Sequence, residues 1–103
     1  MAKYELKLRN AEGQTVVYEK DFISVRKTRE AMRLIEEQES KKAESEMFDS
    51  QVNFIAGIFD EVTADMILDG LDASAGMNTL NELFFKILGY DEKKIKAILE
   101  AEM

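Results

Sequence analysis

The sequence predicts a mostly helical α+β domain, in which an N-terminal β-hairpin is followed by about five α-helices. Near the N-terminus, apolar and polar side chains alternate, which is the period of half-buried strands. From residue 24 onward, apolar side chains recur at the i, i+4, i+7 spacing of amphipathic helices. Because 103 residues give room for one domain, we expect a single domain over residues 1–103, with the hairpin at 3–20 and the helical part at 24–103.

The hairpin is predicted from two short segments that flank a turn. In residues 3–9, Tyr4, Leu6 and Leu8 point to one side and charged residues point to the other. Residues 10–13 contain Asn and Gly, which tolerate the positive φ angles of turns. Residues 14–20 then supply Thr, Val and Tyr side chains, which favour strands.

The first helix is expected to begin after Ser24, a residue suited to the N-cap position, and to run from Val25 to about Glu39. Residues 39–46 contain no large apolar side chain, so they form either a loop or a solvated continuation of the helix, and we favour the loop. The apolar set that identifies this helix is Val25, Ala31, Met32, Leu34 and Ile35.

The second helix, Met47–Val62, is the clearest element of the sequence. Its apolar arc is wide, which indicates a central helix with neighbours on two sides. Gly57 lowers helix stability by about 1 kcal/mol relative to Ala, and we expect close packing against a neighbour to compensate. The arc consists of Phe48, Val52, Ile55, Phe59 and Val62, flanked by Met47, Phe54 and Ile58.

Three shorter helices are expected in the remainder of the chain. Thr63 and Asp91 are suited to cap the N-termini of the first and the last of these helices, and Gly89 is suited to end the middle helix. The expected helices are Ala64–Leu71, Met77–Leu88 and Glu92–Ala101, with residues 72–76 as a linker of small residues.

Charge is strongly sorted along the chain, whose net charge is −7. Residues 43–85 hold nine carboxylates and no Lys or Arg, whereas the basic residues are densest between positions 26 and 33. The negative charge argues against nucleic acid and anionic membranes as partners. The acidic stretch is either the solvated face of an ordinary helical domain or a surface that meets a partner.

Little in the sequence points to catalysis. The chain has no His and no Cys, which removes the commonest general base and the commonest metal ligands. Asp65, Asp69 and Asp72 share one helical face, but they are explained as the solvated side of a short helix. Residues 69–76 lack the ligand pattern of a calcium loop. We therefore expect no catalytic residue, no metal site, no cofactor, and no segment of the roughly 18 apolar residues that span a membrane.

Two groups of residues are candidates for binding a partner. The basic group lies on the first helix and either forms a solvated face, partly paired with nearby Glu residues, or docks an acidic partner segment. The apolar group includes two consecutive phenylalanines, which a helix cannot bury on one face, although burial of both in the core is favoured. The candidates are Arg26, Lys27, Arg29 and Arg33 in the basic group, and Phe54, Ile58, Phe84 and Phe85 in the apolar group.

Several segments, taken in order, carry a family resemblance. They are YELKLRN at 4–10 with Glu12-Gly13 and residues 18–22, RKTREAM at 26–32, IFD at 58–60, residues 63–73, and the Leu-rich helix that ends in Leu88-Gly89. In this order they resemble the small tail assembly chaperones of long, non-contractile-tailed phages and prophages of Gram-positive hosts. The resemblance covers about the first 90 residues of the chain and rests on the order of the segments rather than on one motif.

The resemblance implies a non-enzymatic chaperone that binds the tape measure protein until tail tube subunits polymerise around it. A longer, frameshifted form of such proteins adds a domain that recruits the tail tube protein, and this sequence would be the short form. The implied location is the bacterial host cytoplasm rather than the mature virion. The helices Met47–Val62 and Met77–Leu88 are the expected contact surface, and their broad apolar arcs suit a homo-oligomer as well as a client.

The main alternative is an acidic inhibitor that mimics DNA, or another kind of protein-binding module. The stretch without basic residues favours it, but the carboxylates alternate with apolar residues instead of forming paired rows. The salt dependence of partner binding would distinguish a chaperone from an inhibitor that mimics DNA, because ionic binding weakens as salt is raised and hydrophobic binding does not. An enzyme that relies on carboxylates is a third alternative, which would require a deep pocket with convergent acids.

Overall fold

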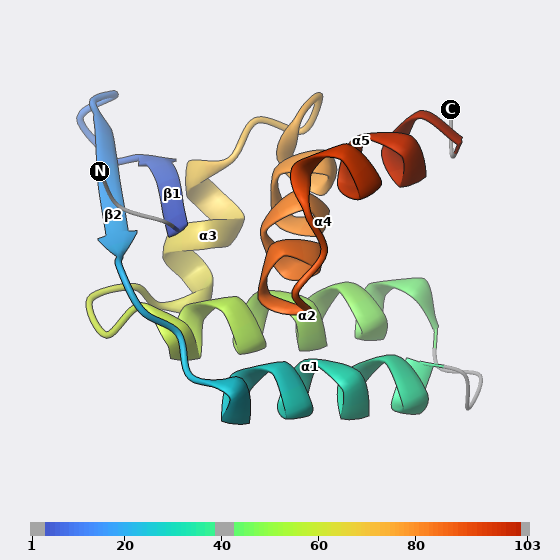
Figure 1. Ribbon diagram of the computed structural model, residues 1–103. Helices are drawn as coiled ribbons and strands as arrows, with labels where there is room; N and C mark the ends of the chain where they lie inside the picture. Colours follow the sequence, from blue (N-terminus) through green and yellow to red (C-terminus); the bar gives the residue numbers. More distant parts are fainter. Residues whose placement is uncertain (1–3, 39–42, 102–103) are drawn as a thin grey trace.

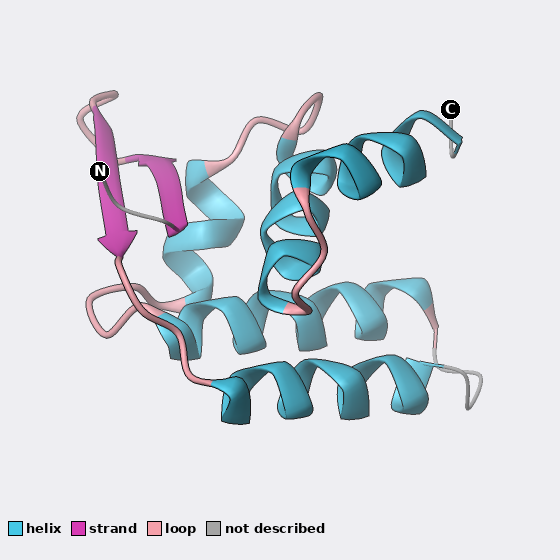
Figure 2. Ribbon diagram, viewed as in Figure 1, coloured by secondary structure: helices cyan, strands magenta, loops and turns pink. Residues whose placement is uncertain are grey.

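The computed structural model describes residues 4–38 and 43–101, and its elements follow the predicted α+β order. Figure 1 shows the hairpin at one end of the molecule, and Figure 2 shows that the rest of the described chain is mainly helical. The elements are β1 (Tyr4–Arg9), β2 (Thr15–Lys20), α1 (Val25–Gln38), α2 (Glu44–Ile58), α3 (Ala64–Gly70), α4 (Gly76–Ile87) and α5 (Glu92–Ala101).

The hairpin is built as its sequence predicts. β1 and β2 pair antiparallel, with Arg9 opposite Thr15 next to the turn. The Asn10 side chain accepts hydrogen bonds from the backbone N–H groups of residues 12 and 14, at 3.0 and 2.9 Å, and Gly13 takes a positive φ of 81°. Alternate side chains of β1 are buried and face α3 and α4, so the hairpin covers one end of the helical core.

The helices form two levels that share one core. α1 and α2 lie side by side, while α4 stands across α2 and carries α5 away from the hairpin (Figure 1). The hydroxyl of Thr28 on α1 donates a 2.8 Å hydrogen bond to the carbonyl of Ile87 at the end of α4. The largest fully buried side chains come from the hairpin, α2, α3 and α4: Leu6, Val52, Ile55, Ile67 and Leu80.

The predicted helix ends are mostly confirmed. The Thr63 hydroxyl accepts a 3.2 Å hydrogen bond from the N–H of Met66, which caps α3. The Asp91 carboxylate accepts a 2.7 Å bond from the N–H of Lys94, which caps α5. Gly89 follows α4 with a φ of 94°, the left-handed conformation expected of a residue that ends a helix.

The bounds of α2 differ from the prediction at both ends. The expected loop is wrong for residues 44–46, which form the first turn of α2, where two glutamates lie near the positive end of the helix dipole. Residues 39–42 lie outside the described part of the chain, as does residue 3 of the expected first strand. At the other end, α2 stops at Ile58, and the segment that follows keeps Phe59 and Val62 buried without helical structure.

Two expectations about packing are wrong. Gly57 is exposed and has open space around the position of a Cβ, whereas Gly70 is the glycine in close contact, with β1. Val25 and Met32 are 82% and 51% exposed, although they were assigned to the apolar face of α1. α1 turns its other side to the core through Ala31, which lies roughly 120° around the helix from Val25.

Candidate protein-binding site

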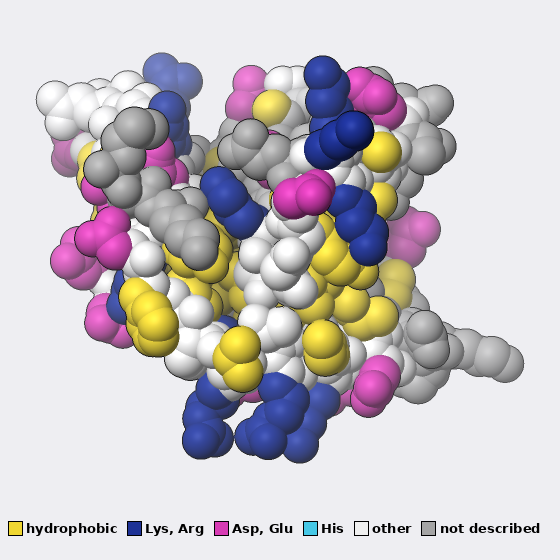
Figure 3. Space-filling view, viewed as in Figure 1, with side chains coloured by type: hydrophobic (Ala, Val, Ile, Leu, Met, Phe, Trp, Pro, Cys, Tyr) yellow, Lys and Arg dark blue, Asp and Glu magenta, His cyan; other side chains and the backbone are white. Residues whose placement is uncertain are grey.

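A groove lies where α4 crosses the pair formed by α1 and α2. Its main hollow has a volume of about 440 Å³. In Figure 3, hydrophobic side chains gather between α5 above and the α1 and α2 pair below, on the side away from the hairpin. We call this hollow the helical groove; its walls are Ile35, Glu44, Met47, Phe48, Gln51, Met77, Asn81, Phe84 and Phe85.

The apolar surface continues beyond the helical groove toward α3. A smaller hollow of about 190 Å³ shares Phe48 and Met77 with it as a common wall. Leu68 on α3, which is 46% exposed, and Met77, which is 53% exposed, lie along this continuation. Because Met is flexible and polarizable, a surface with Met77 and Met47 in its walls can adapt to different apolar side chains.

One side-chain hydrogen bond fixes the base of the helical groove. The Gln51 amide on α2 donates to the Asn81 amide oxygen on α4 over 3.0 Å, and Gln51 is only 8% exposed. This bond satisfies two polar groups in an apolar setting and holds α2 against α4. Neither residue can be identified from the sequence, because an amide in an amphipathic helix has no distinctive pattern.

A row of aromatic rings connects the groove to α5. Phe54 on α2 meets Phe84 edge to face at 5.6 Å between centroids, and Phe84 lies 6.4 Å from Phe85. Phe85 in turn stacks on Tyr90 at 5.7 Å. Among the described elements α5 packs on α4 alone, so these rings hold the upper side of the groove in place.

The four predicted apolar anchors separate into two pairs. Phe85 is half-buried and lines the groove, and Phe54 is half-buried beside it in the aromatic row. Phe84 and Ile58 are only 4% and 5% exposed, so they are core residues rather than exposed anchors. Phe84 reaches the groove as part of its floor, and Ile58 lies at the far end of α2.

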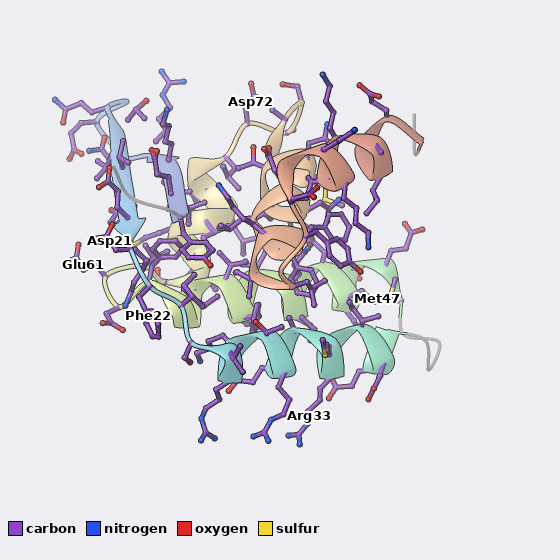
Figure 4. All side chains as sticks on the ribbon, viewed as in Figure 1. Asp21, Phe22, Arg33, Met47, Glu61 and Asp72 are labelled. Atoms are coloured by element: carbon purple, nitrogen blue, oxygen red, sulfur yellow. The ribbon has the colours of Figure 1, made fainter. Side chains whose placement is uncertain are left out.

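The basic residues lie on another surface. Arg26, Arg29 and Arg33 are exposed on the side of α1 that faces away from the core, as Figure 4 shows for Arg33. Lys27 is half-buried and pairs with Glu30 at 3.1 Å, one of the ion pairs expected for a solvated face. The structure therefore does not bring the basic group and the apolar anchors together in one site.

The walls of the groove carry negative charge and no positive charge. Except for Ile35, every residue that lines the groove and its continuation belongs to residues 43–85, the stretch without Lys or Arg. Glu44 lines the groove, and Asp72 lines the continuation from the loop between α3 and α4 (Figure 4). The site is thus an apolar surface with carboxylates in its walls, which suits binding of a partner.

Other features of the described residues do not form a comparable site. A hollow of about 320 Å³ between the hairpin and α3 has Arg9 and two aspartates, Asp65 and Asp69, in its walls and so presents mixed charge. No group of three or more potential metal ligands occurs in residues 4–38 and 43–101. Within these same ranges no helix has the length and apolar character needed to cross a bilayer.

Comparison with known proteins gives one match. A family model described as "Phage tail chaperone protein" matches residues 1–103. Neither a curated protein nor a solved structure matches the chain.

Proposed function

The chain belongs to the phage tail chaperone family, and we propose that it is a non-enzymatic chaperone that binds the tape measure protein and helps to recruit tail tube subunits. The observation that supports this function is the helical groove, an apolar surface between α1, α2 and α4. A helical client would place its apolar stripe in this groove.

The physical basis of such chaperoning is the covering of apolar surface. A long amphipathic helix outside its assembled partner exposes an apolar stripe that favours aggregation. Each large apolar side chain that enters the groove contributes roughly 1.5–3 kcal/mol through burial. The net charge of −7 would then keep several bound copies apart in solution.

The remaining parts of the proposal concern the place and the course of assembly. The chain acts in the cytoplasm of the bacterial host and leaves before the virion is mature. Tail tube subunits are brought by a longer, frameshifted form that shares this fold, and the fold described here supplies the client-binding surface.

Co-expression with the tape measure protein from the same gene cluster tests the function. We expect the chain to keep the client in the soluble fraction and to co-purify with it through high salt, because apolar contacts are not screened. Met77→Lys should abolish this effect by placing a charge in the groove wall. Met32→Lys is a matched control, because Met32 is 51% and Met77 53% exposed and Met32 lies outside the groove.

Two results would contradict the proposal. One is an insoluble client with the chain left alone in solution. The other is equal activity of the Met77 and Met32 variants, which would place the client on another surface. Binding to basic proteins that disappears as salt is raised would instead support an acidic inhibitor that mimics DNA.

A further inference from the structure

We infer that the client segment seated in the helical groove is an amphipathic helix whose apolar stripe is flanked by Lys or Arg residues. The inference rests on the proposed function, because it specifies the chemistry of the client at that site. It follows from three features of the groove: the charge of its walls, the backbone that forms them, and the length of the walls.

The charge of the walls selects against acidic clients. α2, α3 and the groove-forming part of α4 lie within residues 43–85, so no cation stands on these walls to pair with a carboxylate of the client. Glu44 and Asp72, by contrast, stand at the edges of the apolar surface and can pair with cations. Since like charges brought together at an interface are unfavourable, the acidic edges favour basic flanks on the ligand.

A basic residue of α5 lies outside the groove but close to its α5 side, because Tyr90 stacks on Phe85. Lys94 lies over the ring of Tyr90, 4.2 Å from its centroid, and neither of these residues lines the groove. The exposed arginines of α1, exemplified by Arg33, point away from the core (Figure 4). A ligand helix in the groove therefore meets apolar side chains and the carboxylates of Glu44 and Asp72 in the walls, with Lys94 beyond the wall on the α5 side.

The backbone of the walls favours a helical ligand over an extended one. The walls belong to α1, α2 and α4, whose backbone N–H and C=O groups are largely used within the helices themselves. Gln51 and Asn81, the amide residues at the base, are hydrogen-bonded to each other. An extended peptide would bury its own backbone groups without partners, whereas a helix satisfies its own.

The length of the ligand follows from the length of the walls. The part of α2 that lines the groove runs from Glu44 to Gln51, eight residues, which is about 12 Å of helix. A client helix of about two turns would match this length and present two or three apolar residues at i, i+4 and i+7 spacing. The Met side chains at positions 47 and 77 allow these anchors to vary, so different stretches of a long client can bind.

Two synthetic helical peptides test the inference with the full chain. Both have about 18 residues, roughly five turns, and the same leucine stripe, but one has Lys and the other Glu at the positions that flank the stripe. Binding is measured by fluorescence anisotropy at low salt. We expect the Lys peptide to bind more tightly, and Met77→Lys to weaken binding of both peptides because it alters the apolar wall.

Paired charge variants locate the source of the preference. The double variant E44Q/D72N removes both edge carboxylates and should reduce the preference by roughly 2- to 30-fold, the effect of two surface ion pairs. The double variant E61Q/D65N removes the same amount of charge outside the groove and its continuation, and should retain the preference. Circular dichroism confirms that each variant is folded before binding is compared.

Several outcomes would overturn the inference. These are equal binding of the two peptides, no binding of either, or a preference that survives in E44Q/D72N. Oligomers in sedimentation that dissociate on Met77→Lys would assign the groove to a second copy of this chain instead. If co-expression still keeps the tape measure protein soluble in any of these cases, the proposed function stands and only the ligand chemistry is wrong.

Discussion

Gly70 is the position where one added methyl group should harm the fold most clearly. A Cβ at Gly70 would lie 3.0 Å from both the carbonyl oxygen of Arg9 and the Cβ of Leu8. Ordinary carbon–carbon contacts are about 3.5–4.0 Å, so α3 would have to move away from β1 by roughly 0.5–1 Å. β1 has little freedom to yield, because it is paired along its length with β2.

The expected magnitude for Gly70→Ala follows from this overlap. Overpacking costs about 1–3 kcal/mol, and the better helix propensity of Ala offsets up to about 1 kcal/mol. The net loss is about 1–2 kcal/mol, which lowers Tm by roughly 4–16 °C in a domain of this size. Gly57→Ala is the matched control, because a Cβ there meets no atom within 4 Å.

Thermal and urea unfolding followed by circular dichroism would measure both variants. We expect Gly57→Ala to raise the free energy of unfolding by a few tenths to about 1 kcal/mol, since only helix propensity changes. A Gly70→Ala variant as stable as the parent chain would refute the reasoning. It would mean that α3 is not held against β1 at the distance described.

Three further changes test local features of the fold. Thr63→Ala should lower the free energy of unfolding by about 1 kcal/mol in urea titration, because the N–H of Met66 loses its cap. Gly13→Ala should lower it by about 1–2 kcal/mol in thermal unfolding, since the φ of 81° is strained for a residue with a Cβ. Gln51→Leu should lower it by about 1–2 kcal/mol in urea titration because Asn81 loses its partner.

The features that the sequence predicts well are those that depend on near neighbours in the chain. Alternation in β1 identifies its buried face, and Asn10 identifies the turn through bonds to residues 12 and 14. The caps at Thr63 and Asp91 join groups only three residues apart. Such interactions are present in the local sequence, so no knowledge of the tertiary structure is needed to find them.

The features that the sequence misses depend on which elements meet. Val25 and Met32 belong to the predicted apolar set of α1 but are exposed, although the other members of that set pack against the core. Helix propensity identifies Gly57 and Gly70 as equally unfavourable, and only the crossing of α3 and β1 shows which one needs to be glycine. The spacing of apolar residues indicates that a helix has an apolar face, but it does not indicate which element packs against that face.

The candidate site was predictable in part for the same reason. The apolar arcs of α2 and α4 indicated two of the helices that form the walls of the groove, and Phe85 lies in that groove. Phe84 is buried by Phe54 and its other neighbours, which the sequence could not reveal. Met77 and Met47 belong to the apolar sets of α4 and α2, and only the arrangement of the helices shows that these two residues line the helical groove.

The absence of basic residues from positions 43–85 is best understood through the surface that this stretch forms. Folding does not require this absence of basic residues, because exposed positions such as Asn53, Ser74 and Asn78 have room for Lys side chains in solvent. Surface charges at such positions change stability little. Surface charges do change the electrostatic field that an approaching partner meets over the apolar walls between Glu44 and Asp72. The sorted charge therefore bears on the surface that we propose for binding, and its sign is the basis for proposing a basic helix as its ligand.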